Sequence, residues 1–188
     1  MNGTLLRSRT VTLLTAASLL TSLTLGIAFV AAHRVYDLRG EAVDAPAVPL
    51  TADEARQQVL EQARQFIGAG RLKAPSDSYL LMSCASEDGP PYQGSVYLTF
   101  DVPSITETPA FFRTIAAAMK ARGWHEGVSP TRYPGGRTLA KDGSSALYHR
   151  HPDLPGRGLL KIYGPCRTVT DHRLDTTGFV DVTAALRP

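Results

Sequence analysis

Two cysteines, Cys84 and Cys166, are the residues of this sequence whose type and placement point most directly to chemistry. They do not form a Cys-x-x-Cys motif, so a redox pair is not supported. Two buried free thiols remain an alternative. An N-terminal apolar segment predicts export, and a cysteine pair outside the cytoplasm is most economically a disulfide. We therefore predict a structural bond between the two cysteines, each on a predicted strand, that closes a loop of roughly 80 residues and stabilises the fold by about 4 kcal/mol.

Metal ligation is the second chemistry to consider. His149, His151 and Asp153 alternate, so on an extended strand their side chains share one face and offer two or three ligands. A folded-back tail would add further ligand types from Asp171, His172 and Asp175. Pro152 interrupts the strand between the candidate ligands, which favours a polar strand edge followed by a loop. We predict no metal and no cofactor.

Motifs for a catalytic site do not occur in the sequence. Gly-x-Ser-x-Gly and Ser-x-x-Lys are absent, and the glycines match neither a phosphate loop nor a dinucleotide fingerprint. Ser144 and Ser145 are expected in a hairpin, and His125-Glu126 lacks the second histidine of a zinc-protease helix. No catalytic residue is assigned, and an envelope hydrolase with an unidentified site is kept as an alternative.

Tyrosines are the remaining candidates for binding. They either line a ligand groove or partner surface, or form ordinary cross-strand pairs. The candidates are Tyr92, Tyr97, Tyr133, Tyr148 and Tyr163.

A strand followed by a helix is the central element that positions these side chains. Residues 94–103 alternate apolar and polar side chains, as in a half-buried strand. Residues 108–123 predict a helix with Thr108 as N-cap, Pro109 in the first position and Gly123 at the C-terminal cap. Its apolar stripe packs on the sheet. The predicted core contains Phe100, Phe112, Met119 and Trp124.

The rest of the domain is predicted to contain further strands and one more helix. Thr51 and Glu54 form a capping box before a helix with apolar residues at helical spacing, which is either packed on the domain or a membrane-proximal stalk. Strands are predicted at residues 79–85, 137–141, 144–150 and 159–166, with a hairpin turn at Asp142-Gly143. Residues 180–186 are either a strand or a helical turn. The fold class is α+β, a two-layer domain with a mainly antiparallel sheet of about five strands and one or two packed helices.

The N-terminal part predicts membrane attachment. Residues 11–32 contain 22 residues without a charge, enough for a transmembrane helix of roughly 30 Å. Arg7 and Arg9 place the tail of residues 1–10 in the cytoplasm, so the single-pass anchor carries residues 33–50 as a linker and residues 51–188 as an extracytoplasmic domain. A signal peptide cleaved after Ala32 is the alternative. No cysteine lies near the end of the apolar run, so lipidation there is excluded.

Charge argues against a nucleic-acid partner. The net charge is +3, but Arg7 and Arg9 precede the apolar run, and the part after it has 18 basic residues against 17 acidic ones. An almost neutral domain is not expected to offer a groove for phosphates.

Two blocks of sequence resemble a known group of proteins. Residues 90–100 with 115–124, and residues 138–143 with 160–167 and 170–173, are similar to small exported membrane proteins and lipoproteins of mycobacteria and their relatives, also found on actinobacterial phages and prophages. The resemblance spans residues 79–186 and implies no activity and no catalytic residues. This chain departs from the lipoproteins because it has a predicted spanning helix in place of an acylated cysteine.

Together these observations predict a membrane-anchored cell-envelope module that binds a protein partner or a ligand and has no identifiable catalytic activity. A prophage-type surface protein that interferes with superinfection is a narrower alternative. A flat aromatic patch would favour a protein partner, and an apolar pocket would favour a ligand.

Overall fold

The computed structural model describes residues 48–73, 76–85, 88–128, 132–175 and 178–187. These ranges belong to one compact unit, residues 48–188. The predicted cytoplasmic tail (1–10), the anchor (11–32) and nearly all of the linker (33–50) lie outside the described residues, so they stay predictions. Within the described ranges, no helix combines the length and the apolar character that a bilayer-spanning segment needs.

The fold is α+β, and the described residues form a sheet of seven strands. The strands are β1 (Ser76–Ser83), β2 (Tyr92–Asp101), β3 (His125–Glu126), β4 (Arg137–Lys141), β5 (Ser144–Arg150), β6 (Arg157–Tyr163) and β7 (Val180–Asp181). Their order is β3-β4-β5-β6-β2-β1-β7, and every neighbouring pair is antiparallel. The prediction of about five strands was too low, because β3 and β7 have two residues each and are too short to show an alternating pattern.

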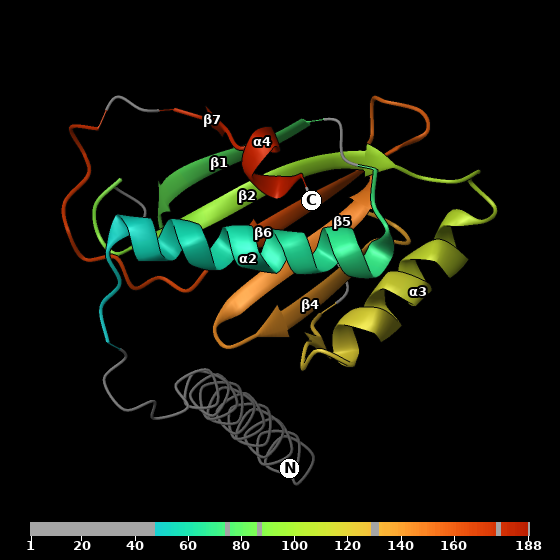
Figure 1. The fold of residues 1–188 in the computed structure, drawn as a ribbon, viewed down its shortest axis with the longest axis horizontal. Coiled ribbons are helices and arrows are strands. Elements are labelled where there is room, and N and C mark those ends of the chain that lie inside the picture. The colour runs from blue at the N-terminus through green and yellow to red at the C-terminus, as the bar shows by residue number, and fades with distance from the viewer. Residues whose placement is uncertain (1–47, 74–75, 86–87, 129–131, 176–177, 188) are drawn as a thin grey trace, which may run out of the picture. The chain divides into compact units, whose positions relative to one another are not determined.

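Three helices are described: α2 (Ala52–Gly70), α3 (Thr108–Lys120) and the short α4 (Thr183–Leu186). α2 runs across the sheet and α3 lies at one end of it (Figure 1). The segment expected to be a strand or a helical turn contains both, β7 followed by α4.

The capping box of α2 is present as predicted. The Thr51 hydroxyl accepts the Glu54 N–H, and the Glu54 carboxylate accepts the Thr51 N–H at 2.8 Å. Val59, Ala63 and Phe66 are completely buried, so α2 is a packed helix and not a stalk.

The start of α3 differs from the prediction by one residue. Glu107 is the N-cap, so Thr108 is already helical. Instead of capping an N–H, the Thr108 hydroxyl lies 2.9 Å from the Ser104 carbonyl and accepts a hydrogen bond from Arg150 at 2.6 Å. Through its hydrogen bond with Arg150, the Thr108 hydroxyl connects the start of α3 to β5. At the other end Gly123 has a φ of 87°, and the Trp124 N–H donates to the Met119 carbonyl.

The hydrophobic core lies between the sheet and the helices. The predicted core residues Phe100, Phe112, Met119 and Trp124 are all buried. Trp124 meets Phe66 of α2 edge to face, with ring centroids 5.2 Å apart. The strands contribute Val96, Leu98, Leu139, Ala146, Tyr148, Leu160 and Ile162. Sheet, α2 and α3 therefore share a single core.

Gly94 shows how closely α2 approaches the sheet. A Cβ at this position of β2 would lie 2.7 Å from the carbonyl oxygen of Ala55. Only a residue without a side chain permits this helix–strand distance. The predicted hairpin between β4 and β5 is also present, with Asp142 and Gly143 at φ values of 48° and 75°.

Candidate functional site

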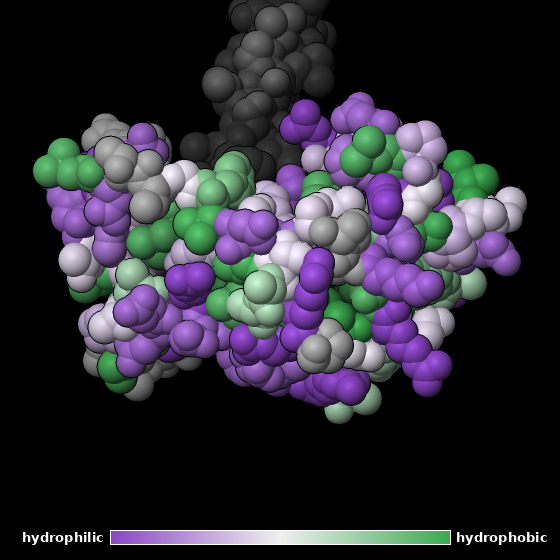
Figure 2. All heavy atoms as spheres, turned by 45° about the horizontal axis from the view of Figure 1, so that its top comes forward, coloured by the Kyte–Doolittle hydropathy of each residue, from purple (hydrophilic) through white to green (hydrophobic). Residues whose placement is uncertain are grey.

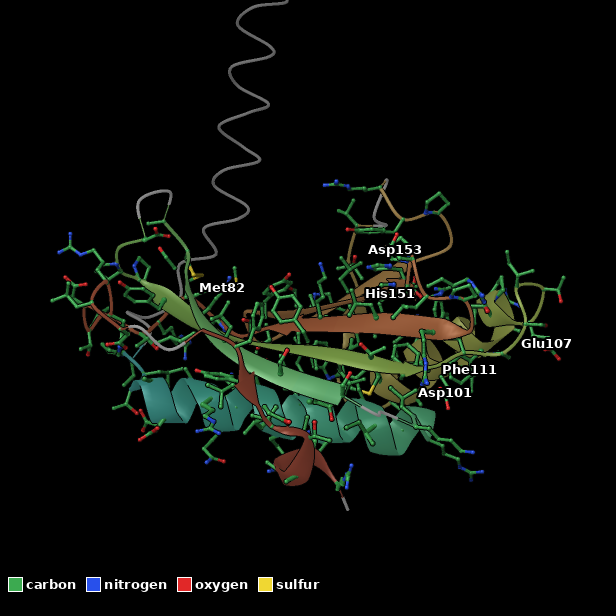
Figure 3. All side chains as sticks on the ribbon, turned by 90° about the horizontal axis from the view of Figure 1, so that it is seen from above. Met82, Asp101, Glu107, Phe111, His151 and Asp153 are labelled. Atoms are coloured by element: carbon green, nitrogen blue, oxygen red, sulfur yellow. A yellow bond between two sulfur atoms is a disulfide. The ribbon has the colours of Figure 1, made fainter. Side chains whose placement is uncertain are left out.

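The face of the sheet opposite the helices is the first candidate site. Because side chains alternate along a strand, the residues between the core positions point to this side. We define the open face by the outward positions of β1, β2, β5 and β6. They are Ser78, Leu80, Met82, Gln93, Ser95, Tyr97, Thr99, Ser145, Leu147, His149, Leu159, Lys161 and Tyr163. Figure 3 shows α2 and α4 on the other side of the sheet, and no helix within the described residues covers the open face.

Three aromatic rings form a cluster on the open face. Tyr97 of β2 lies 5.4 Å from Phe179 and 6.2 Å from Tyr163 of β6, measured between ring centroids. Both contacts are nearly perpendicular, at 87°. We call Tyr97, Tyr163 and Phe179 the tyrosine patch. The Lys161 ammonium lies 5.6 Å from the centre of the Tyr97 ring and adds a cation to the patch.

Burial keeps the phenol of Tyr163 neutral. Burial raises the pKa of Tyr163, and the neighbouring Tyr97 hydroxyl raises it further. The Tyr163 phenol is therefore protonated at every physiological pH. The patch thus offers apolar ring faces with a hydroxyl that both donates and accepts hydrogen bonds.

The predicted metal candidates His149, His151 and Asp153 do not share one face of a strand, because β5 ends at Arg150. His149 is buried and stacks on Tyr133 at 3.7 Å, with the ring planes 5° apart. Its Nδ1 lies 2.7 Å from the Arg150 carbonyl, and burial lowers the pKa of His149, so the ring is neutral with its proton on Nδ1. His151 turns away from the strand, and its Nδ1 accepts the N–H groups of Asp153 and Leu154 at 3.1 Å.

The candidate ligands of the tail also serve other contacts. His172 Nδ1 lies 2.6 Å from the Asp175 carboxylate, and the His172 ring meets Tyr92 edge to face at 5.3 Å. The Asp171 carboxylate accepts hydrogen bonds from Arg173, which lower the pKa of Asp171 to about 2. Within the part of the chain that the structure describes, no three His, Cys, Asp or Glu side chains gather as a metal site. The tail residues hold the tail against Tyr92.

These tail contacts do not provide a hydrolase site either. The His172–Asp175 pair resembles the base and orienting acid of a catalytic triad. However, His172 Nε2 is shielded from solvent and has no hydrogen-bond partner among the described residues. The ring therefore does not present a base to a substrate.

The predicted disulfide is present between Cys84 and Cys166, with Cα atoms 6.1 Å apart. The expectation that both cysteines lie on strands was wrong, because Cys84 follows β1 and Cys166 lies three residues beyond β6. Next to the bond, Tyr92 pairs with Thr168 in an isolated bridge. The disulfide thus joins the start of the tail to the end of β1.

The five candidate tyrosines divide between the two faces of the sheet. Tyr92 and Tyr148 are buried in the core, where the Tyr148 hydroxyl donates to the Phe112 carbonyl at 3.2 Å. Tyr97, Tyr133 and Tyr163 belong to the open face or contact it. Sequence reasoning missed Phe179 and Lys161. Because Leu159, Lys161 and Tyr163 alternate along one strand, the sequence could have placed Lys161 on the same face as Tyr163. Phe179 lies in a tail without periodicity, so no pattern predicts its position.

The other polar candidates have structural contacts. Ser144 is buried and accepts a hydrogen bond from Gln62 of α2 at 2.8 Å. His125 and Glu126 form β3, where Glu126 pairs with Arg137 at 3.1 Å. These residues connect elements of the fold.

Comparison with known proteins identifies relatives of this domain. The family model described as "Putative lipoprotein LppJ" matches residues 51–185, from the cap of α2 to α4. Proteins named "Putative lipoprotein LppJ" from Mycobacterium tuberculosis (strains CDC 1551 / Oshkosh and ATCC 25618 / H37Rv) and Mycobacterium bovis (strain ATCC BAA-935 / AF2122/97) are each 37% identical over 137 residues. The match covers 70% of this chain and 69% of each relative. No solved structure matches. The predicted resemblance to mycobacterial lipoproteins is confirmed, and the chain belongs to the LppJ family.

Proposed function

We propose that this chain is a cell-envelope module, held at the membrane outside the cytoplasm, that binds a protein partner through the tyrosine patch. The observation that carries the proposal is the perpendicular contact of Tyr97 with both Tyr163 and Phe179 on the open face. Aromatic residues are enriched in protein–protein interfaces because they bury a large area at a low cost in side-chain entropy.

The surroundings of the patch also favour a protein partner. A hollow of about 320 Å³ lies beside Tyr97 and Phe179. Its lining is rich in hydroxyl groups, from Ser76, Ser78, Thr99 and Thr183, with the carboxyl groups of Asp77 and Asp181. A partner side chain with an apolar stem and a hydrogen-bond donor at its tip would fill this hollow, while Lys161 would meet an acidic group of the partner.

The membrane location rests on the sequence and on the family. The relatives are named lipoproteins, which implies attachment through an acylated cysteine. In this sequence both cysteines belong to the disulfide. We therefore infer that the apolar segment at residues 11–32 holds the module instead. A disulfide is stable outside the cytoplasm, which agrees with this location.

Site-specific photo-crosslinking in intact cells tests the proposal. A photoreactive phenylalanine derivative replaces Tyr97 in one variant and Thr114, on the exposed side of α3, in a matched control. We expect a discrete crosslinked envelope protein at position 97 that is absent at position 114. The same products at both positions, or none at position 97, would contradict a partner on the open face.

A separate measurement tests the location. Protease added to intact spheroplasts is expected to digest the domain, and the protein is expected in the membrane fraction. A soluble mature form that begins at His33 would reject the anchor in favour of a cleaved signal peptide.

A further inference from the structure

A groove on the helix side of the domain has features that the tyrosine patch does not use. The last turns of α2, the residues just after it and α4 line an open groove of about 430 Å³. This volume lies within the range of roughly 300–1,000 Å³ that is common for small-molecule sites. We call it the α2–α4 groove. It lies across the sheet from the open face, on the side where Figure 3 shows α2 and α4.

The groove combines an apolar floor with a basic rim. Ile67, Leu72 and Leu186 supply the floor. Arg64, Arg71 and Arg187 supply the rim, and no carboxylate of the described residues belongs to the lining. On the surface drawn in Figure 2, hydrophobic residues gather in small groups between hydrophilic ones. The lining of the groove places three apolar side chains beside three guanidinium groups.

The three arginines differ in the partners that they already have. Arg64 donates from Nε to the Ala185 carbonyl at 3.2 Å and pairs with Glu61 at 3.2 Å. This contact ties α4 to α2 and fixes one wall of the groove. Burial and Asp181 raise the pKa of Asp77 while Arg187 counteracts them, so the Arg187 guanidinium already lies within electrostatic reach of carboxylates.

Arg71 is an arginine of the rim that remains available for a ligand. Its backbone is the C-cap of α2, with a φ of 47°, and its N–H bonds back to the last turn. Its side chain is exposed, and its guanidinium makes no hydrogen bond or ion pair with the described residues. A guanidinium held at a fixed backbone position beside an apolar floor suits a planar anion that carries an aliphatic chain.

We propose that the α2–α4 groove binds a long-chain fatty carboxylate, with the acyl chain on Ile67, Leu72 and Leu186 and the carboxylate on Arg71. Arg187 and Arg64 add positive potential at the rim. Burial of the chain on the floor supplies most of the binding free energy, and the bidentate contact with Arg71 sets the preference for an acid over a neutral lipid. A small anion without a chain would leave the floor unused.

Photolabelling of the full chain tests this site directly. The protein is reconstituted in nanodiscs of zwitterionic phosphatidylcholine and irradiated with a palmitate analogue that carries a diazirine in its acyl chain. Mass spectrometry then locates the labelled peptides. We expect label on residues 64–72 and 184–187. Excess palmitate should remove this label, and the methyl ester of palmitate should compete for it at least tenfold less effectively.

Matched variants separate the site from general hydrophobic labelling. Arg71→Gln is expected to lower the groove label about tenfold, whereas Arg113→Gln, an exposed arginine of α3 outside the groove, leaves it unchanged. Equal competition by the methyl ester, or a groove label that Arg71→Gln does not change, would overturn the proposal. In a second experiment, a phosphatidylglycerol that carries a diazirine is added to the bilayer and palmitate is left out. If this lipid labels the groove, the groove binds the membrane surface, and the proposal of a fatty carboxylate is overturned as well.

Discussion

Tyr97 and Tyr163 lie on neighbouring strands and meet edge to face on the side of the sheet that no described helix covers, with ring centroids 6.2 Å apart. They are diagonal neighbours, since Tyr97 pairs with Lys161 and Tyr163 pairs with Ser95. A sheet that holds both rings in place before binding lowers the entropy lost when a partner docks. This arrangement is the structural basis of the proposed function.

The contact between the two rings is measurable as a coupling free energy. Tyr97→Ala and Tyr163→Ala each remove the same aromatic contact, so the double variant is expected to lose less stability than the sum of the single losses. The difference should be about 0.5–1.5 kcal/mol. A double-mutant cycle from urea unfolding measures it. Losses that add within about 0.3 kcal/mol would show that the rings do not interact.

The disulfide is expected to stabilise the domain because it lowers the conformational entropy of the unfolded chain. Cys84→Ser leaves Cys166 as a free thiol and should lower the free energy of unfolding by about 2–5 kcal/mol. The variant that replaces both cysteines should lose about the same amount, because one bond is removed in each case. Mass spectrometry of the unreduced, alkylated protein checks the bond itself. Alkylation of both cysteines without reductant would contradict it.

Two glycines that meet different surroundings test the packing of α2 on the sheet. Gly94→Ala places a Cβ 2.7 Å from the Ala55 carbonyl oxygen and should destabilise the domain by about 1–3 kcal/mol. Gly68→Ala is the matched control, because a Cβ there meets nothing within 4 Å and α2 gains helix propensity of roughly 0.5–1 kcal/mol. Thermal unfolding compares the two. Similar effects of both substitutions would contradict the close approach of α2 to β2.

The raised pKa of Asp77 is expected to make the free energy of unfolding depend on pH. Burial, followed by the charge of Asp181, raises the pKa of Asp77 to about 6, well above the ordinary range of an aspartate, although Arg187 opposes the rise. The folded state therefore binds the proton more tightly than the unfolded state does, and this contribution to stability is lost as the pH rises from about 4 to about 6.

Asp77→Asn removes this titration. The variant should be more stable than the parent at pH 7.5 by about 1–2 kcal/mol, after allowance for screening, and should lose its advantage at pH 4. Urea unfolding at the two pH values measures the difference. A variant that is less stable than the parent at pH 7.5 would show that the ionised carboxylate stabilises the fold.

Much of the fold was predictable because its signals are local. The capping box of Thr51 and Glu54 and the Asp142-Gly143 turn depend on a few consecutive residues. The stripe of α3 predicted the burial of Phe112 and Met119 for the same reason. β3 was not counted among the predicted strands, and β7 was left open as a strand or a helical turn. Partners distant in sequence define a two-residue strand: Glu126 pairs with Leu139, and Val180 pairs with Tyr79.

The candidate site was predictable only in part, because it depends on which strands become neighbours. Alternation places Tyr97 on one side of its strand, but the pairing of β2 with β6 is what brings Tyr163 beside it. Phe179 reaches the patch because β7 pairs with β1. The α2–α4 groove likewise needs α4 to return to the end of α2, which no local pattern indicates.

Hydroxyl-radical labelling of the protein in native envelopes and of the purified protein tests the central claim most directly. If a protein partner covers the tyrosine patch, labelling of Tyr97 and Phe179 falls several-fold in envelopes, while labelling of Ile105, which is 73% exposed in the β2–α3 connection, stays the same. Equal labelling of Tyr97 and Phe179 in the two preparations would show that the open face has no partner and would contradict the proposed function.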